Sequence, residues 1–501
     1  MGIKMTHYRF LTSVVGLVAV GLCGCARVDP AHDYERVGGE TKAAVGAYDT
    51  YDPAAESAIS ERVVEILEDG LTVDEAVQIA LVNNPALQAS YMSIGMARAD
   101  VVQSRLLANP VLGLSLQLPE AGGRANLQAS IAQSIVELWQ IPVKARGAER
   151  ELDGAILRLA REAASLAMDA KSAYWQAVGA SASHAISIEN RDLAKKLVDA
   201  ALARQKAGAV GELDVNLARG TFLAAELEVT QARLDASTRR RALATVLGLT
   251  VDADSLMLLS DMDMVDLEGM AAEGVVETAL EARLDLRAAE QAMTAAAARL
   301  KLEYARVFPE VSLGIMLERE HRRAQKGRKI FADTLKSSVA NGGFTAPDLQ
   351  SRGERNLERR ADIDAIVGPS LSIELPIFDQ NQAQIAKAKY EYDQTAKTYE
   401  SIQRRIVQDV RQAFDAALTT EEVARFYDGT LLPQAQTNLD LSRETYQAGR
   451  TSLVTVIEAQ RSLLDSRRAG VSAKQSAMTA AAELEREMGR PLGGKVNATD
   501  E

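Results

Sequence analysis

The sequence predicts a mainly α-helical protein with a smaller β part, built as a duplicated helix-strand-strand-helix unit. Three observations predict this class. Apolar residues make up 47% of the 501 residues but aromatic residues only 4%, a balance typical of long helices packed through Ala, Leu and Val. No proline occurs from Val143 to Phe308, and short alternating segments interrupt the helical pattern. The whole arrangement occurs twice along the chain.

The start of the chain predicts export from the cytoplasm. Lys4 and Arg9 give a positive beginning, and an apolar run of 13 residues follows that is too short to span a bilayer as a helix. The run ends in Leu22-Cys23-Gly24-Cys25, which resembles a bacterial lipobox. We therefore expect a lipoprotein signal peptide over 1-24 and lipidation of Cys25. The alternative is an ordinary signal peptide that happens to carry two cysteines.

The two halves of the chain align with each other. An offset of 199 residues places Leu87 on Leu286 and Pro110 on Pro309, and farther along an offset of 241 places Gly208 on Gly449. The larger offset indicates an insertion of 42 residues in the second copy. The repeat predicts a first copy over 71-265 and a second copy over 266-492. With the lipobox, this leaves a lipid-anchored arm over 25-70 and a polar tail over 493-501.

Alternation predicts two strands in each copy. Leucine occupies every even position from Leu112 to Leu118 while small or polar residues occupy the odd ones, which indicates a strand with one apolar face. Strands are expected near 110-118 and 126-138, and again near 309-317 and 366-375. The segment 318-366 is rich in charge and accounts for most of the insertion. We expect it to be a long solvent-facing loop.

Unusually long helices flank these hairpins. The segment from Val143 to Ala207 would reach roughly 100 Å as one helix at ~1.5 Å per residue. The segment from Gln380 to Ala448 matches it, with Pro433 as its interruption. The first of these segments carries a heptad pattern, in which apolar residues recur at alternating intervals of four and three residues. They are Leu152, Ile156, Leu159, Ala163, Leu166, Ala170, Ala173 and Ala177. The pattern alone is typical of any coiled coil, and only its position beside amphipathic hairpins favours a channel wall.

Charge and composition exclude several classes of function. The formal charge of −12 argues against nucleic acid as a partner, because phosphate binding needs a basic face. The chain has four histidines, and its two cysteines both precede residue 26. A zinc site, a histidine general base or a cysteine nucleophile would need residues that the sequence mostly lacks. We therefore expect no enzyme activity, no metal site and no cofactor.

The hairpins separate two classes of function. Strands of eight to eleven residues with a leucine face suit a tilted membrane strand. Four strands cannot close a barrel alone, because unpaired edges are not tolerated in hydrocarbon, so several protomers would have to share one barrel. The alternative is a lipid-tethered periplasmic coiled-coil scaffold protein without a pore, in which the same segments form a small soluble sheet.

The order of these features resembles the TolC-type outer membrane factors. The resemblance runs from about Leu71 to Leu492 and rests on the duplication and on motifs that are weak singly. They are Leu71-Thr72-Val73-Asp74-Glu75-Ala76, Asn84-Pro85-Ala86-Leu87, Leu371-Ser372-Ile373-Glu374-Leu375-Pro376-Ile377-Phe378-Asp379, Leu432-Pro433-Gln434-Ala435 and Tyr446-Gln447-Ala448-Gly449.

The resemblance implies a homotrimer in the cell outer membrane. Its protomers would share a 12-stranded β-barrel continued by a long α-helical coiled-coil tunnel through the periplasm. The implied function is the exit duct of a tripartite efflux or secretion system, which passively conducts substrates to the exterior. The implied partners are a periplasmic adaptor (membrane fusion) protein, an inner-membrane efflux pump of the resistance-nodulation-division type, and outer membrane lipid around a lipid-anchored chain.

The resemblance also implies roles for five residues after the long helices. Glu458 matches an acidic ring at the pore aperture, and Thr455 stands where relatives carry a second carboxylate. Asp214 and Tyr446 match a pair that links neighbouring helices in the closed state, and Arg450 lies one position from a gating arginine. Without the resemblance, Glu458 and Asp214 are interpreted as solvated charges near helix ends.

Overall fold

The computed structural model describes residues 26–118, 125–250, 252–259, 262, 264–267, 269–321, 339–340, 342 and 363–492. The predicted signal peptide, Cys25, the polar tail beyond 492 and most of the predicted loop lie outside these residues. The chain divides into two compact units. The first comprises 1–100, 149–294 and 393–501, and the second comprises 101–148 and 295–392. The prediction of a mainly helical chain with a few strands is confirmed.

The first unit begins with short helices before the long ones. They are α2 (Ala31–Val45), the 3-10 turn η1 (Pro53–Ala55), α3 (Glu56–Glu68) and α4 (Val73–Asn83). Helix α4 begins at a capping box in which Thr72 Oγ1 accepts the Glu75 amide and the Glu75 carboxylate accepts the Thr72 amide. This pairing satisfies two amides that would otherwise lack a partner at the helix start.

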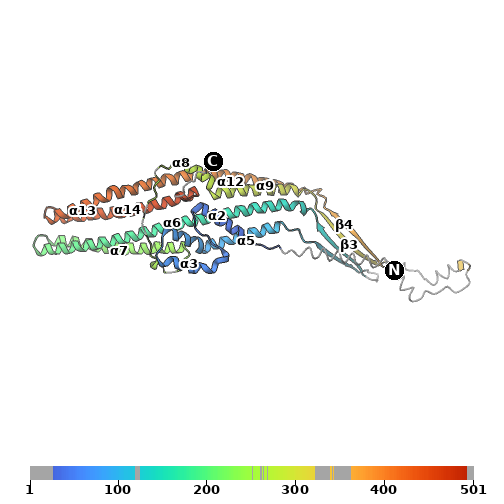
Figure 1. Ribbon diagram of the computed structural model, residues 1–501, viewed down its shortest axis with the longest axis horizontal. Coiled ribbons are helices and arrows are strands. Elements are labelled where there is room, and N and C mark those ends of the chain that lie inside the picture. Colours follow the sequence, from blue (N-terminus) through green and yellow to red (C-terminus); the bar gives the residue numbers. More distant parts are fainter. Residues whose placement is uncertain are drawn as a thin grey trace. The chain divides into compact units, whose positions relative to one another are not determined.

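Long helices make up the rest of the first unit. They include α7 (Glu212–Val246), α13 (Leu432–Gln447) and α14 (Leu453–Met488), with the shorter η2 (Ala253–Ser255) and α8 (Ala272–Ala282). Four helices contribute residues to both units: α5 (Pro85–Ser104), α6 (Glu137–Lys206), α9 (Leu284–Ala305) and α12 (Gln382–Phe426). Figure 1 shows α6 with α7, and α13 with α14, as antiparallel pairs that turn back at the same end.

The interruption expected at Pro433 is a local change of helix type. The five residues of η3 (Tyr427–Leu431) form a π turn between α12 and α13. Leu432 donates its amide to Tyr427 O, five residues back, and Pro433 follows at the start of α13. Proline has no amide to donate, so the wider turn lets the helical path continue across a position that would break a regular α-helix.

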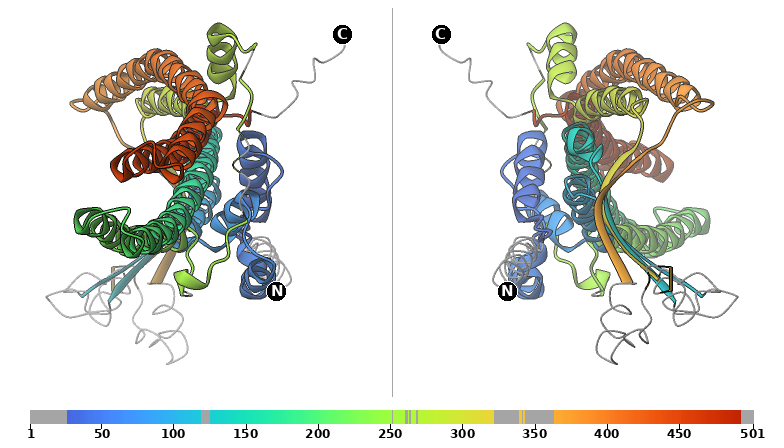
Figure 2. Two further views of the ribbon diagram at one scale, coloured as in Figure 1. Left: turned by 90° about the vertical axis from the view of Figure 1, so that its left-hand side faces the viewer. Right: turned by 90° about the vertical axis from the view of Figure 1, so that its right-hand side faces the viewer.

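Two clusters of buried apolar side chains hold the helices of the first unit together, one within the second repeat and one between the two repeats. One cluster takes Val275 and Ala279 from α8, Val410 and Phe414 from α12, and Leu484 from α14. A second cluster joins the two antiparallel helix pairs near their turns. Figure 2 shows these two pairs end-on, as two curved layers of helix. Alanine at many of the buried positions lets neighbouring helices approach closely.

The second unit is organised around one antiparallel sheet. It contains β1 (Val111–Gln117), β2 (Asn126–Ser134), β3 (Val311–His321) and β4 (Ile363–Ile373), in the order β1-β2-β3-β4. The register places Leu112 opposite Ile131, Ile131 opposite Ile315, and Ile315 opposite Pro369. Because side chains alternate between faces, this register places the apolar side chains of all four strands on the same face of the sheet.

Two predicted boundaries differ from the structure. The strand expected to run to residue 138 ends at Ser134, because Leu138 donates its amide to Ile135 O and opens the first turn of α6. The loop expected over 318-366 is shorter, because Glu318 pairs with Ile366 and His321 with Ile363. Backbone hydrogen bonds extend the ladder through these charged residues, since pairing of the main chain does not require apolar side chains.

Candidate functional site

One face of the sheet is apolar and exposed. Leu112 and Leu114 of β1 are 65% and 70% exposed, and Ile315 of β3 is 57% exposed. The remaining exposed apolar residues of this face are Leu116, Leu127, Ile131, Leu313, Leu317, Val367, Leu371 and Ile373. A contiguous apolar surface of this kind marks a place where another protein or a membrane is bound.

The opposite face is mostly small and polar. Its side chains include Ser115, Gln117, Asn126, Gln128, Ser130, Ser134, Ser312, Glu318, Ser370 and Ser372. Gly314 lies on this face, where a Cβ atom would come within 2.6 Å of Ile131 O and 2.7 Å of Ser370 Oγ. Glycine is therefore required at this point for neighbouring strands to pack as they do. The apolar residues on this face are Val111, Ala132, Met316 and Ile366.

The edges of the sheet are open in the part of the chain that the structure describes. Strand β1 pairs only with β2, and β4 pairs only with β3. Each outer strand therefore presents unpaired amides and carbonyls along one side. An apolar face beside two open edges is suited to pairing with further strands, because a closed sheet satisfies these groups.

The two long helix pairs turn at equivalent glycines. Gly208 and Gly449 have φ angles of +69° and +71°, which side chains with a Cβ rarely adopt. After Gly449, Arg450 donates its amide to Thr445 O at 2.9 Å, and the residue after Gly208 makes the same bond to Arg204 O. Both turns are thus Schellman motifs, and the predicted duplication extends to their hydrogen bonds.

Arg204 ties the two turns together. Its Nη1 donates to Tyr446 O at 2.8 Å, and its guanidinium lies 4.4 Å from the centre of the Tyr446 ring. The stacked arrangement combines a charged hydrogen bond with a cation-π contact. A groove of 520 Å³ beside it is lined by both residues together with Lys196, Arg443 and Gln460. Sequence reasoning missed Arg204, because its partner lies 242 residues away.

The predicted aperture residues lie at these turns but do not all meet. Tyr446 is buried, and its hydroxyl has no hydrogen-bond partner in the described part of the chain. It therefore does not bond Asp214, which is half-buried in the first turn of α7. Thr455 and Glu458 are exposed on one face of α14, and Arg450 is exposed in the turn. Cys25 lies outside the described residues.

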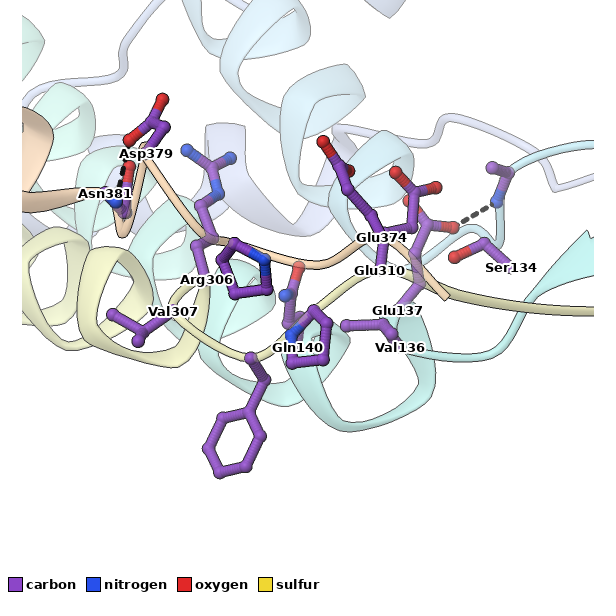
Figure 3. Close-up of a pocket in the computed structure, with 14 residues that line it drawn as sticks. Ser134, Val136, Glu137, Gln140, Arg306, Val307, Glu310, Glu374, Asp379 and Asn381 are labelled. Carbon is purple, nitrogen blue, oxygen red and sulfur yellow. Dashed lines mark hydrogen bonds between the residues drawn. The ribbon is translucent and has the colours of Figure 1, made fainter. Parts of the chain in front are cut away.

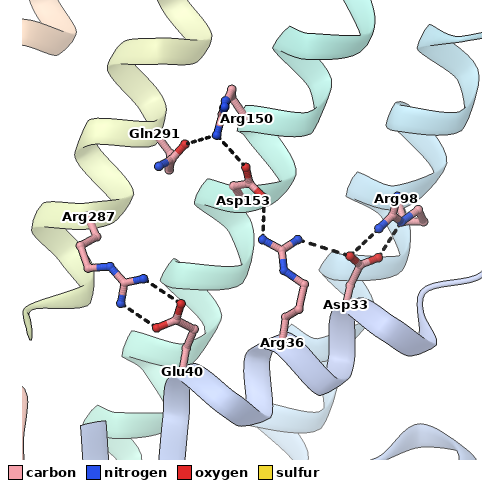
Figure 4. A network of polar contacts seen from close by, with 8 residues as sticks. All are labelled: Asp33, Arg36, Glu40, Arg98, Arg150, Asp153, Arg287 and Gln291. Carbon is pink, nitrogen blue, oxygen red and sulfur yellow. Dashed lines mark hydrogen bonds and ion pairs between the residues drawn. The ribbon is translucent and has the colours of Figure 1, made fainter. Parts of the chain in front are cut away.

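The segment after Cys25 is held by an ion-pair network that the sequence did not indicate. Figure 4 shows α2 against α5, α6 and α9. Asp33, fully buried, accepts hydrogen bonds from Arg98 at 2.6 and 2.5 Å. Arg36 donates to Asp153 at 2.7 Å, and Glu40 receives both terminal nitrogens of Arg287 at 2.6 and 2.7 Å.

Electrostatics of this network favour the charged forms. Hydrogen bonding to Asp33 raises the pKa of Arg98 against the opposing effect of burial, and hydrogen bonding to Glu40 does the same for the pKa of Arg287. Each arginine therefore stays charged in its partly buried position. The arm is fixed to three helices by directional contacts rather than by apolar packing alone.

No helix in the described residues combines the length and the apolar character needed to cross a bilayer. Across the same parts of the chain, no three acidic, histidine or cysteine side chains are grouped so that they could hold a metal ion.

Comparisons with known proteins place this architecture in a family. The sequence pattern described as "Outer membrane efflux protein" matches residues 76–249 and 275–490, one segment for each copy. The chain is 21% identical over 428 residues to the cobalt-zinc-cadmium resistance protein CzcC of Cupriavidus metallidurans, covering 84% of this chain and 90% of that protein.

Two solved structures share the fold at 19% identity. A membrane protein from Pseudomonas aeruginosa gives a TM-score of 0.64, covering 83% of this chain and 93% of that one. CusC, whose structures concern folding and transmembrane channel formation, gives a TM-score of 0.62 with coverage of 83% and 91%. With more than half of its residues matched by the family pattern, this chain belongs to the outer membrane efflux protein family.

Proposed function

We propose that three copies of this chain form the outer membrane exit duct of an efflux or secretion machine. The duct is passive: it conducts substrates that a periplasmic adaptor and an inner-membrane pump deliver, without catalysis of its own. The pump is of the resistance-nodulation-division type that the family resemblance implies. The names of two similar proteins support this direction, since CzcC is a metal resistance protein and the CusC structures concern transmembrane channel formation.

The observation that carries the proposal is the sheet with one exposed apolar face and two open edges. In hydrocarbon every backbone group must be paired, so this sheet is stable there only if its edges close against other copies. Two copies would give an eight-stranded barrel, whose interior side chains nearly fill. Three copies give twelve strands and leave a lumen, lined by the small and polar face.

The long helix pairs supply the rest of the duct. Helix α7 carries exposed Leu213, Leu223, Leu227 and Leu234 at spacings close to the helical repeat. Such a stripe needs a partner helix, and a neighbouring copy provides one in the trimer. The turns at Gly208 and Gly449 then form the periplasmic aperture, where the adaptor docks. Lipid on Cys25 tethers the arm to the membrane; several acyl chains are needed for stable attachment.

Paired substitutions in β1 test the membrane role of the sheet. Leu114 lies on the apolar face and Ser115 on the polar face, and both are exposed. Leu114→Lys places a charge in the lipid and costs about 2–4 kcal/mol at the bilayer centre, whereas Ser115→Lys faces the lumen and leaves insertion intact. The amount of heat-resistant trimer in outer membrane fractions measures the difference. Equal insertion of the two variants would favour the lipid-tethered scaffold without a pore.

A second variant tests the aperture. Three Glu458 carboxylates around one axis repel each other by roughly 0.7 kcal/mol per pair at ~6 Å in water, so a cation there is favoured. Glu458→Gln should weaken block by divalent cations and reduce cation selectivity in reconstituted pores, while Asp465→Asn, farther along α14, serves as the control. Unchanged selectivity and block in Glu458→Gln would remove Glu458 from the aperture. The roles that the resemblance implies for Thr455, Asp214, Tyr446 and Arg450 are separate proposals about the same turns.

A further inference from the structure

A pocket of 380 Å³ lies at the base of the sheet, inside the second unit. Its lining comes from the segment before β1, the start of α6, the turn between α9 and β3, and the segment after β4 (Figure 3). The charged side chains that line it are Glu137, Glu310, Glu374 and Asp379 with Arg306. Four carboxylates against one guanidinium give the pocket a negative balance.

Two of these residues, both exposed, lie side by side at the end of the sheet. Val311 pairs with Ile373, so Glu310 and Glu374 are the next opposed pair, and Glu374 donates its amide to Glu310 O at 3.0 Å. Opposed residues share a face, with their Cβ atoms about 5 Å apart. Within the described residues neither carboxylate has a hydrogen bond or an ion pair. Like charges so placed repel unless a cation lies between them.

The remaining charges of the pocket already have partners. Glu137 accepts the Ala108 amide at 2.6 Å and lies 3.6 Å from Lys144 Nζ. Asp379 accepts the amide of Asn381 at 2.8 Å. Arg306, the cation of the lining, donates to Glu303 at 2.6 Å. The uncompensated negative charge is therefore concentrated on Glu310 and Glu374.

The side chain of Gln140 also lines this space. Gln140 is only 8% exposed and lines the pocket, and its side chain has no hydrogen-bond partner in the described part of the chain. Figure 3 shows the side chain directed into the space between Arg306 and Glu310. The amide atoms are open to the pocket and are not sealed inside the protein, so the Gln140 carbonyl is suited to accept a hydrogen bond from a molecule there.

We propose that this pocket binds a cation that presents N–H or O–H donors, held by Glu310, Glu374 and Gln140. The volume is far larger than a bare ion and has room for about a dozen water molecules at ~30 Å³ each. Both a hydrated divalent cation and an organic ammonium fit this description. Glu310 and Glu374 lie on the polar face of the sheet, which would line the pore of the proposed channel. Only this location inside a pore rests on the proposed function, and cation binding itself does not.

Calorimetry of the detergent-extracted full chain tests the proposal directly. The first probe is hexaamminecobalt(III). Its ammonia ligands are not replaced by carboxylates, so it can bind only through its charge and its N–H donors. Glu374→Gln and Glu310→Gln should each weaken its binding by about fivefold or more, because each removes a charge-assisted hydrogen bond. Gln140→Met, which leaves the charge unchanged, should weaken binding by about threefold.

Glu318→Gln is the matched control, since it removes the same charge from the same face at the other end of β3. Its binding should stay within about twofold of the wild type, because exposed charges at that distance are screened. Neither carboxylate variant should lower the melting temperature, because each relieves repulsion. Titrations with spermidine and with Mg²⁺ then distinguish the two kinds of ligand. Tighter binding of spermidine indicates an organic ammonium ligand, and tighter binding of Mg²⁺ indicates a hydrated metal cation.

Two results would overturn the inference: a wild type that does not bind hexaamminecobalt(III), or Glu310→Gln and Glu374→Gln variants that bind it as the wild type does. An unchanged affinity in Gln140→Met would remove that residue from the site. All titrations are made in a Glu458→Gln background, so that the proposed aperture adds no cation site of its own. Calorimetry requires no pore, so failure of cation binding and failure of the proposed channel function are separate results.

Discussion

At the scale of single residues, the most constrained side chains are those that join distant segments. Asp33 and Arg98 connect the arm to α5, and Arg204 connects the two turns through Tyr446. None of these pairs was predicted from the sequence, because a contact across 65 or 242 residues depends on tertiary register that no local pattern encodes.

Removing the charge of Asp33 should be costly. Asp33→Asn leaves Arg98 and Arg36 without their shared carboxylate in a buried setting, and loss of one partner of a buried ion pair costs about 3–5 kcal/mol. Asp49→Asn is the control, because Asp49 is half-exposed and pairs with exposed Arg62, where the loss is about 1 kcal/mol or less. Thermal unfolding of the two variants measures the difference, and equal melting temperatures would contradict the role given to the Asp33 contact.

At the scale of elements, the sequence predicted what local periodicity encodes. Alternation located the strands because one face of each is uniformly apolar, and Pro433 located the interruption now described as a π turn. The arm over 25-70 was predicted without any helix, although it contains α2 and α3. Helix α2 carries two adjacent glycines, Gly38 and Gly39, which weaken the helical signal, and its stability comes from contacts with other segments.

Two glycine substitutions test how the elements are stabilised, and their effects should have opposite signs. Gly39 lies inside α2 with open space around its Cα, so Gly39→Ala should stabilise the protein by about 0.5–1 kcal/mol. Gly449 has a φ angle of +71°, so Gly449→Ala should destabilise its turn by roughly 1–2 kcal/mol. Chemical denaturation of both variants checks the signs. A stabilising Gly449→Ala would show that this turn does not hold the conformation described.

At the scale of the whole molecule, the chain exposes more apolar surface than one copy can cover. The sheet face around Leu114 and the α7 stripe around Leu227 are both exposed. Membership of the outer membrane efflux protein family and the open sheet edges give these surfaces one explanation, a barrel and tunnel completed by further copies. The sequence predicted the repeat that builds a protomer. Sharing of one barrel by several protomers was expected because four strands cannot close a barrel alone. The number of copies could be expected only from the resemblance, since periodicity does not encode it.

The most direct test of this account is the planar-bilayer conductance of the detergent-extracted protein, with its mass determined in the same sample. We expect a trimer that gives discrete, cation-preferring openings, because three four-stranded sheets close one barrel around a polar lumen. A monomer, or a protein that stays electrically silent and washes readily from the membrane, would contradict it.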